Sequence, residues 1–333
     1  MKALVLNRPH EPLRFTDQPA PKPGRGEVLV ALKAAALNRR DYWVTEGLYP
    51  DIRCPVILGS DGAGVVTAVG RGVGSHWLGQ AVIINPGYYW GDDPSAQSGD
   101  FRILGMPDNG TFAELISVPL RQIHRKPELF TWEQAGALPL AALTAFRALM
   151  RQGRLESGQT ALITGIGGGV ATYALQFAVA GGARALVTSS SPAKLDRAAA
   201  MGACGGLLYT EPDWADRLLS GYGPVDVVVD GAGGEGYARL IDVARPGGRI
   251  VNYGATAGAP GSLDLRKVFW KQLHLVGSTM GSPADFADML QAVSHRGIQP
   301  VIDSVLPLAR GNDAIERMKT CGQFGKLVLR IAD

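Results

Sequence analysis

The chain has 333 residues, of which 46% are hydrophobic and 19% are charged, and its 33 basic and 30 acidic residues give a formal net charge of +3. A disordered chain would be poorer in apolar residues, so this is the composition of a folded protein of about two domains. The charges are scattered along the sequence, which offers neither the basic stripe of a nucleic-acid-binding protein nor an acidic tail.

The cysteines and the N-terminal run indicate the compartment. Cys54, Cys204 and Cys321 are odd in number and too far apart for a disulfide framework or a CxxC site, which favours a reducing environment. The N-terminal apolar run is too short for a signal peptide, and no run approaches about 18 apolar residues. We therefore expect a cytoplasmic protein with no membrane segment and no nucleic-acid partner.

Residues 1 to 122 predict a β-rich domain. Short runs rich in valine and leucine are separated by glycine or proline, which is typical of strands. The expected strands are Lys2 to Leu6, Glu27 to Ala34, Gly64 to Val69 and Gln80 to Ile84.

Residues 160 to 180 predict a strand, a tight glycine turn and a helix. Glycines let the backbone turn sharply and approach a bound group, and the N-terminus of the helix then presents free N–H groups to a phosphate. The sequence pattern is GxxGxxA rather than GxGxxG, so the motif alone is weak evidence for a phosphate site. The alternative is a flexible loop before a core helix. The residues that carry it are Gly165, Gly168 and Ala171.

The next strand, Ala185 to Thr188, ends without the acidic residue that usually binds the ribose of NAD. Ser189 and Ser190 follow, then Lys194; small hydroxyls with a nearby cation suit a 2′-phosphate. This pattern favours NADP(H) over NAD, although the serines could equally be the loop and N-cap of the next helix.

Later strands extend the same pattern. Strands that alternate with helices imply parallel βαβ units, so we expect a doubly wound domain from about residue 125 to 280. The strands are Val225 to Asp230, Arg249 to Asn252 and Leu273 to Gly277.

Together with the glycine turn, three N-terminal stretches make the whole chain resemble the medium-chain dehydrogenase/reductase superfamily, and within it the zinc-free quinone oxidoreductase branch. These stretches are Ala36 to Pro50, Gly59 to Gly64 and Gly110 to Glu114. The resemblance implies an α/β fold, in which a β-rich GroES-like substrate domain (1–124 and 281–333) accompanies a Rossmann NADP-binding domain (125–280), with substrate bound in the cleft between them. It also implies a homodimer or homotetramer, formed most simply through the edge strand near residues 273–277.

The zinc ligands of related alcohol dehydrogenases are replaced here. By motif, Asn38, Ser60 and Leu140 stand where those enzymes have Cys, His and Cys, and Asp61 stands at their adjacent glutamate. Zinc needs about three ligands from Cys, His or carboxylate, so we expect no catalytic metal. The segment 86–109 resembles a structural zinc lobe without its cysteines; it either shapes the cleft or a subunit contact, or is a solvated insertion.

Without a metal to stabilise an alkoxide, a conjugated acceptor is the easier substrate, because its enolate or hydroquinone anion needs only hydrogen-bond donors. We therefore expect a quinone or α,β-unsaturated carbonyl substrate. The resemblance implies that Asn38, Trp43 and Tyr49 position the substrate. The alternative for the two aromatic side chains is that they pack in the domain core. Arg40 would pair with Asp41 or Asp61, or attract an acidic substrate group.

Further cofactor contacts follow from the resemblance. The contacts near the pyrophosphate include residues at the start of the helix. A lysine and a tyrosine would contact the 2′-phosphate, and a threonine and a glycine would contact the nicotinamide. Lys326 would contact the pyrophosphate or, alternatively, be an exposed strand lysine. The full set is Thr144, Gly165, Gly168, Gly169, Val170, Ser189, Ser190, Lys194, Tyr209, Gly254 and Lys326.

Three functions remain open at this point. The first is an NADPH-dependent reductase of quinones or enones, the second a metal-free aldehyde or alcohol oxidoreductase, and the third an NADPH-binding protein without turnover. Only turnover with an added acceptor distinguishes the first from the third.

Overall fold

The computed structural model describes residues 1–332, which form two compact units. Unit 1 comprises Met1–Ala141, Ser282–Asp288 and the described residues from Gln299 onward, and unit 2 comprises Ala142–Gly281 and Met289–Ile298. The segment 125–141 thus groups with unit 1, because helix α2 (Trp132–Ala137) packs on the β-strands of that unit.

Unit 1 is built mainly on antiparallel β-structure, with β17 and β18 paired in parallel. Its largest sheet has the strand order β10-β6-β5-β3-β18-β17, with β9 also paired to β3. These strands are β3 (Glu27–Ala36), β5 (Asp61–Val69), β6 (Ala81–Ile84), β9 (Leu115–Pro119), β10 (Ile123–Arg125), β17 (Ile302–Pro307) and β18 (Lys326–Arg330). Along most of β3 buried and half-buried side chains alternate, as expected for a strand with one face on a core.

Smaller elements complete unit 1. Two further sheets have the orders β2-β1-β4 and β7-β8. Their strands are β1 (Lys2–Leu6), β2 (Arg14–Asp17), β4 (Val56–Ile57), β7 (Gly87–Tyr88) and β8 (Arg102–Ile103), and the accompanying helices are α1 (Arg39–Thr45), α10 (Gly311–Lys319) and the 3-10 turns Ser75–Trp77, Leu120–Gln122 and Leu308–Arg310. The segment 86–109 therefore contains the short β7-β8 hairpin.

Unit 2 is a six-stranded sheet in which every pair is parallel, in the order β13-β12-β11-β14-β15-β16. The strands are β11 (Thr160–Ile163), β12 (Arg184–Ser189), β13 (Gly205–Leu208), β14 (Val225–Asp230), β15 (Ala244–Asn252) and β16 (His274–Gly277). This order reverses at β11 and β14, as in a doubly wound dinucleotide-binding fold. The expected α/β fold with a Rossmann sheet and a β-rich domain is confirmed.

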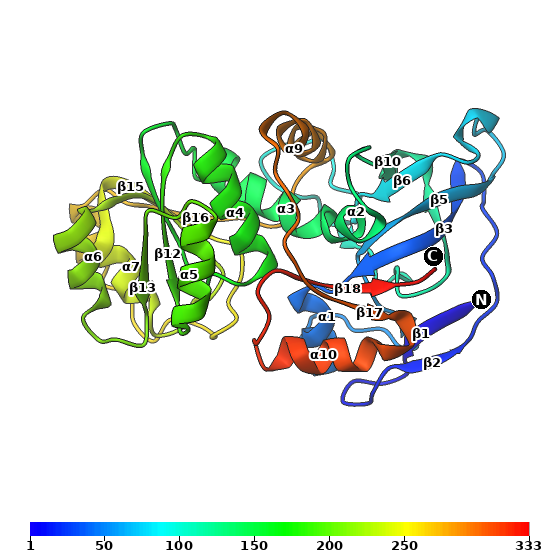
Figure 1. Cartoon of the computed structure of the whole chain (residues 1–333), viewed down its shortest axis with the longest axis horizontal. Helices are drawn as coiled ribbons and strands as arrows, with labels where there is room; N and C mark the ends of the chain where they lie inside the picture. The colour runs from blue at the N-terminus through cyan, green and yellow to red at the C-terminus, as the bar shows by residue number, and fades with distance from the viewer. Residues whose placement is uncertain (333) are drawn as a thin grey trace. The chain divides into compact units, whose positions relative to one another are not determined.

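Helices cover both faces of this sheet (Figure 1): α4 and α5 lie on one side, and α6 and α7 on the other. Their bounds are α4 (Gly169–Ala180), α5 (Pro192–Ala200), α6 (Trp214–Tyr222), α7 (Tyr237–Val243) and α8 (Leu265–Trp270). Helix α3 (Pro139–Phe146), which continues as a π-helical turn at Arg147–Gln152, and helix α9 (Pro283–Arg296) contain residues of both units.

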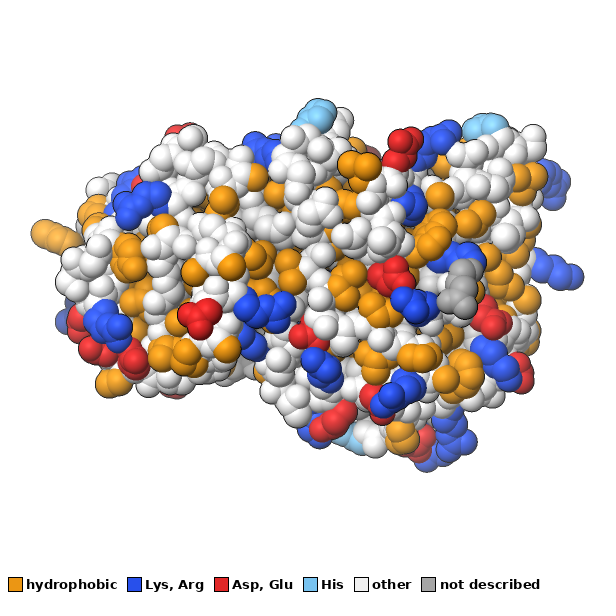
Figure 2. Space-filling view, viewed as in Figure 1, with side chains coloured by type: hydrophobic (Ala, Val, Ile, Leu, Met, Phe, Trp, Pro, Cys, Tyr) orange, Lys and Arg blue, Asp and Glu red, His pale blue; other side chains and the backbone are white. Residues whose placement is uncertain are grey.

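The surface is mixed in charge. On the face drawn in Figure 2, basic and acidic side chains are interspersed among polar and apolar ones. Within residues 1–332, no helix combines the length and the apolar character needed to cross a membrane.

Candidate active site

Helix α1 is anchored at its N-terminus by a buried carboxylate. The backbone N–H of Asn38 donates to Asp41 Oδ2 at 2.8 Å, and the N–H of Gly59 donates to Asp41 Oδ1 at 3.3 Å. Asp41 is fully buried, and this burial raises the pKa of its carboxyl to about 6 against the opposing effects of Arg40 and the Asn38 N–H. Asp41 thus ties the start of α1 to the turn before β5.

A lysine ammonium lies beside Asn38 and Asp61. Lys326 Nζ donates to Asn38 Oδ1 at 2.6 Å and to Asp61 Oδ2 at 2.8 Å, and Asn38 Nδ2 donates to the same carboxylate oxygen at 2.9 Å. The backbone N–H of Leu140 binds the other oxygen, Asp61 Oδ1, at 2.7 Å. Lys326 is 3% exposed and Asp61 is 0% exposed, so the alternative of an exposed strand lysine is wrong. Buried charges are tolerated when they are paired and hydrogen-bonded, as these are.

Arg40 forms a second buried cluster. Its Nη1 donates to Ser60 Oγ at 2.8 Å and to the carbonyl of Leu104 at 2.9 Å, and its Nη2 donates to the carbonyl of Met106 at 3.2 Å. The guanidinium carbon also lies 5.0 Å from the ring centre of Tyr49, and Nε donates to the Tyr49 hydroxyl at 3.4 Å. The donors of Arg40 therefore go to Ser60 and to the 104–106 backbone, in place of the expected bonds to Asp41 or Asp61.

These contacts test whether the site suits zinc. The positions that the sequence resemblance assigns to zinc ligands carry Asn38, Ser60 and Leu140. The nearby carboxylate of Asp61 is already bound to Lys326. Within residues 1–332 no group of three or more His, Cys, Asp or Glu side chains could hold a metal ion. The Lys326 ammonium would repel Zn²⁺, and Asn, Ser and Leu do not supply the Cys, His or carboxylate ligands that zinc requires. The residues present therefore do not fit zinc.

The two aromatic candidates are half-buried on and after α1. The ring centres of Trp43 and Tyr42 are 5.0 Å apart, and Tyr49 packs against the core formed by β1, β4 and β18. Tyr49 therefore has a packing contact in addition to its contact with Arg40. The positioning role of Trp43 and Tyr49 stays a prediction.

In unit 2, the glycine turn joins the end of β11 to α4. The N–H of Ile166 donates to the carbonyl of Thr188 at 2.8 Å, and the N–H of Gly165 donates to Thr188 Oγ1 at 3.3 Å, which holds the turn against the end of β12. Gly165 has φ +63°, and Gly168 caps α4. A Cβ at Gly165 would meet nothing within 4 Å, and one at Gly168 only a carbonyl oxygen at 3.7 Å. The turn, which leads into Gly169 and Val170, therefore faces open space, as a phosphate cradle requires.

The expected 2′-phosphate residues gather at the ends of neighbouring strands. Ser189 Oγ accepts from the N–H of Ser191 at 3.1 Å, and the Ser189 carbonyl accepts from the N–H of Tyr209 at 3.0 Å. Ser190 is exposed, Tyr209 is 50% exposed, and Lys194 lies in the first turn of α5. Ser189 itself is buried, so Ser190 is the more accessible of the two serines. Binding of a 2′-phosphate by these residues stays a prediction.

The remaining two cofactor candidates are placed differently. Thr144 is buried in α3, with Oγ1 4.0 Å from Met280 Sδ. Gly254 follows β15, and a Cβ there would lie 3.0 Å from the carbonyl oxygen of Gly231, so a close backbone approach already accounts for this glycine.

Asp230, at the end of β14, is a site residue that was not predicted from the sequence. It accepts hydrogen bonds from Thr164 Oγ1 at 2.6 Å, from Asn252 Nδ2 at 2.9 Å and from the N–H of Gly233 at 2.9 Å. Asp230 therefore joins three strand ends at the edge where α/β folds bind ligands. A buried acidic residue ending an apolar strand was the available signal.

Comparison with known proteins agrees with this architecture. The alcohol dehydrogenase GroES-like domain family matches residues 24–128, and the zinc-binding dehydrogenase family matches residues 169–295. The chain belongs to the medium-chain dehydrogenase/reductase superfamily and is an oxidoreductase of that group.

Three relatives are similar over nearly the whole chain. The zinc-type alcohol dehydrogenase-like protein YogA of Leptosphaeria maculans is 36% identical, covering 96% of this chain and 95% of its own. The acryloyl-coenzyme A reductase of Sulfurisphaera tokodaii is 28% identical, covering 99% and 100%. A crystal structure of an NAD-dependent alcohol dehydrogenase superposes with a TM-score of 0.94 at 37% identity, covering 100% of both chains.

Proposed function

We propose that the protein is an NADPH-dependent reductase that transfers hydride to an α,β-unsaturated carbonyl or a quinone without catalytic zinc. The observation that carries this proposal is the Lys326 ammonium bound to Asn38 and Asp61, at residues that correspond to the zinc site of related dehydrogenases. A fixed positive charge there can stabilise an enolate through a hydrogen bond, which is a weaker demand than binding and deprotonating an alcohol. Similarity to an acryloyl-coenzyme A reductase supports the same class of substrate.

Preference for NADPH is the second part of the proposal. It is supported by Ser189 and Ser190 at the end of β12, by Lys194 on α5 and by the half-exposed Tyr209. A 2′-phosphate would gain charge-assisted hydrogen bonds from this group, and no carboxylate in these positions repels it. The chain is also similar to a dehydrogenase described as NAD-dependent, so a preference for NADH is the alternative that an experiment must exclude.

When bound, a reduced nicotinamide supplies the hydride. The task of the chain's own residues is to hold the acceptor and to stabilise the negative charge that develops on its oxygen. An ammonium has three N–H donors, of which Lys326 directs two to Asn38 and Asp61. In this proposal its third donor and the second amide N–H of Asn38 bind the substrate oxygen, while Trp43 and Tyr49 contact a planar substrate.

A metal-free aldehyde or alcohol oxidoreductase is the second candidate, favoured by the full-length similarity to an alcohol dehydrogenase. It needs a proton donor for the alkoxide, and Tyr49, whose ring lies 5.0 Å from the Arg40 guanidinium, is one phenol next to a cation. An NADPH-binding protein without turnover is the third.

We propose a homodimer, or a tetramer built from such dimers, in which a second copy covers β16. This strand is the edge of the unit 2 sheet, and an open edge is a template for pairing. The adjoining helix α8 exposes Leu265, Phe269 and Trp270 at 64%, 67% and 83%. The three cysteines are exposed, which further supports the proposed reducing, cytoplasmic location.

The decisive experiment titrates the protein with NADPH and NADH in parallel and then adds acryloyl-coenzyme A, 1,4-benzoquinone or benzaldehyde to the tighter complex. We expect tighter NADPH binding and oxidation of NADPH by the thioester or the quinone. Oxidation by benzaldehyde alone would establish the second candidate. Tight binding without oxidation by any acceptor would favour the third.

A further inference from the structure

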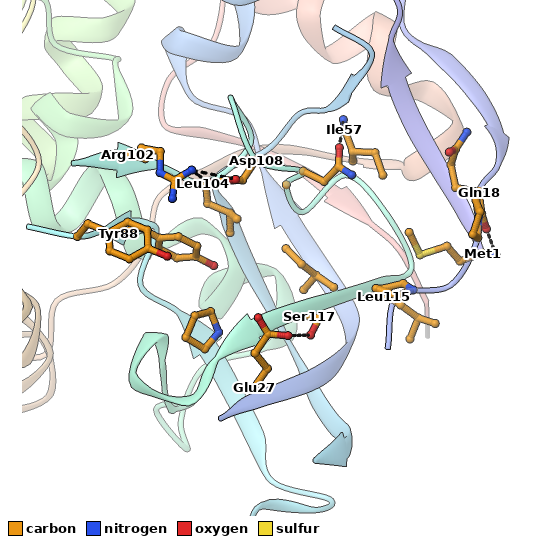
Figure 3. A pocket seen from close by; sticks show the side chains of 17 residues that line it. Met1, Gln18, Glu27, Ile57, Tyr88, Arg102, Leu104, Asp108, Leu115 and Ser117 are labelled. Carbon is orange, nitrogen blue, oxygen red and sulfur yellow. Dashed lines mark hydrogen bonds and ion pairs between the residues drawn. The ribbon is translucent and has the colours of Figure 1, made fainter. Parts of the chain in front are cut away.

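Unit 1 contains a pocket of about 470 Å³ that none of the cofactor or substrate candidates lines (Figure 3). Its charges cancel, because Arg102 and Asp108 pair at 3.3 Å and the lining otherwise includes one ammonium, at Met1, and one carboxylate, at Glu27. The pocket therefore has no net charge that would select a ligand. In unit 2, by contrast, the buried carboxylate of Asp230 lies beside the predicted cofactor residues.

The loops that follow β14 and β15 are joined to each other at the carboxyl edge of the unit 2 sheet. These paired loops are residues 231–236 and 253–258. The N–H of Ala257 donates to the carbonyl of Ala232 at 2.8 Å, and the N–H of Gly234 donates to the carbonyl of Gly258 at 2.8 Å. Gly234 has φ +63°, and a Cβ there would lie 2.8 Å from Ala257 Cβ, so this close approach requires glycine. The paired loops thus form one hydrogen-bonded layer.

The carboxylate of Asp230 binds these paired loops to the glycine turn. Its Oδ1 accepts from Thr164 Oγ1 at 2.6 Å, and its Oδ2 accepts from the N–H of Gly233 at 2.9 Å and from Asn252 Nδ2 at 2.9 Å. Asp230 is 1% exposed and none of these donors is a cation, so hydrogen bonds stabilise its buried charge. Thr164 directly precedes Gly165, so its hydroxyl links the start of the turn to the paired loops.

The bond between Thr164 and Asp230 crosses the point at which the strand order of the sheet reverses. This point lies between β11 and β14, which are neighbours in the sheet. In doubly wound folds a dinucleotide lies across the reversal, with one mononucleotide on each half of the sheet. The predicted 2′-phosphate residues belong to the half β11-β12-β13, and the paired loops belong to the half β14-β15-β16. Asp230 therefore joins the two halves.

Tyr237 on α7 fixes the orientation of one donor to Asp230. Its hydroxyl donates to Asn252 Oδ1 at 2.7 Å, which leaves Asn252 Nδ2 to donate to the carboxylate. Burial, and then the charge of Asp230, raises the pKa of the Tyr237 phenol, so the phenol stays protonated and remains a donor. The carboxylate is thus held by an ordered chain of side chains from β14, β15 and α7.

We propose that Asp230 is a positioning residue, which holds the glycine turn and the paired loops in the arrangement that a bound dinucleotide needs. In the NADPH-dependent function proposed above, on which this role rests, the glycine turn binds the pyrophosphate and the paired loops contact the nicotinamide half. Asp230 acts through these two segments, because its own oxygens are occupied by donors of the protein. Its loss should weaken the whole dinucleotide and spare a ligand that reaches only the β11-β12-β13 half.

The test titrates Asp230→Asn and the parent by calorimetry with NADPH and with adenosine 2′,5′-bisphosphate, which lacks the nicotinamide half. The variant keeps the size of the side chain but turns an amide N–H₂ group toward other donors. NADPH should therefore bind about tenfold or more weakly, as for loss of a charged hydrogen bond. The bisphosphate should bind as it does to the parent, because Thr188 still holds the glycine turn to the end of β12.

Asp226→Asn is the matched control. Asp226 lies at the opposite end of the same strand, and its carboxylate also accepts from a β11 residue, the N–H of Thr160, at 2.8 Å. This variant should lower the urea midpoint but leave both dissociation constants unchanged. A second pair of variants keeps the test decisive if Asp230→Asn does not fold: Thr164→Ser retains the hydroxyl and should retain NADPH affinity, whereas Thr164→Val should lose it.

Equal losses of NADPH and bisphosphate affinity in Asp230→Asn would overturn the proposal. The same selective loss in Asp226→Asn, or equal NADPH affinities of the two Thr164 variants, would also overturn it. Lack of turnover with every acceptor would refute the reductase assignment without changing these binding results. If the parent prefers NADH, the same comparison uses NADH and AMP, so a wrong cofactor preference is recognised separately. Binding of neither dinucleotide to the parent would refute the cofactor assignment together with the role of Asp230.

Discussion

Lys326 Nζ lies 2.8 Å from Asp61 Oδ2, although 265 positions separate the two residues in the chain. Asn38 completes the group by accepting from the lysine and donating to the aspartate. A cation carried by the protein itself thus lies among residues that, by the sequence resemblance, are proposed to replace a metal site. This group lies within unit 1, and both units offer measurable consequences.

Lys326→Met should destabilise unit 1 strongly. The variant leaves the Asp61 carboxylate buried without its counter-ion, a loss that typically costs about 3–5 kcal/mol of unfolding free energy. Urea denaturation measures it, with Lys319→Met as control, because the pair of Lys319 with Glu316 is exposed and contributes about 0–1 kcal/mol. Adding Asp61→Asn to the Met variant should restore part of the loss. Equal effects of the two lysine variants would contradict the buried ion pair.

Metal analysis of protein purified without chelator should find far less than one zinc per chain. The donor set around Asn38 and Asp61 lacks the cysteine and histidine ligands that zinc selects, and Lys326 repels a cation. A chelator should therefore leave NADPH oxidation unchanged. One stoichiometric zinc, or activity lost to the chelator and restored by zinc, would require the site to be reinterpreted.

Lys194→Ala should weaken NADPH selectively. A charged hydrogen bond to the 2′-phosphate contributes about 1.5–3 kcal/mol, so the NADPH dissociation constant should rise about tenfold or more while that of NADH changes little. Nicotinamide fluorescence during titration measures both, and Lys22→Ala, an exposed lysine of unit 1, serves as control. Equal losses for the two cofactors would remove the basis for NADP preference.

The buried Asp41 should make stability depend on pH. Burial raises the pKa of its carboxyl from 3.8 to about 6, so between these values the folded state binds more protons than the unfolded state. The unfolding free energy should then fall by up to about 3 kcal/mol as the pH rises from about 4 to 6. Urea midpoints across this window should show that dependence in the parent but not in Asp41→Asn; parallel curves would contradict it.

Trp270→Asp should dissociate the proposed dimer. A charge in the middle of an apolar contact is left desolvated in the assembly, so the variant should elute as a monomer while the parent is a dimer or a tetramer. Light scattering after gel filtration measures the mass. Leu129→Asp alters a leucine that is 91% exposed in unit 1 and should leave the oligomer intact; a monomeric parent would refute the proposal.

Local patterns explain what could be predicted from the sequence. The glycine turn at 165–169 and the apolar parallel strands of unit 2 are each encoded within a short stretch, where glycine conformation and strand periodicity act directly. The parallel α/β domain was predicted from these patterns, and the superfamily and the GroES-like domain were predicted from the resemblance of the N-terminal stretches; fold class and superfamily are confirmed.

Pairings across the chain could not be predicted in this way. The partners of Lys326 and Arg40 depend on the register of β18 beside β3 and on the path of residues 104–106, which no local periodicity specifies. Tertiary contacts of this kind determine which buried polar groups meet.

Strand β18 lies between β3 and β17, and the chain reaches it only after the continuous stretch Ala142–Gly281 that forms most of unit 2. During translation, the parallel sheet of unit 2 can therefore fold while unit 1 still has an unpaired edge on β3, where another nascent chain could add a strand. Asp61 also lacks its cation until Lys326 leaves the ribosome. The buried ion pair of the proposed site is thus completed last, and a chain stalled before residue 326 would keep the Asp61 carboxylate without its counter-ion.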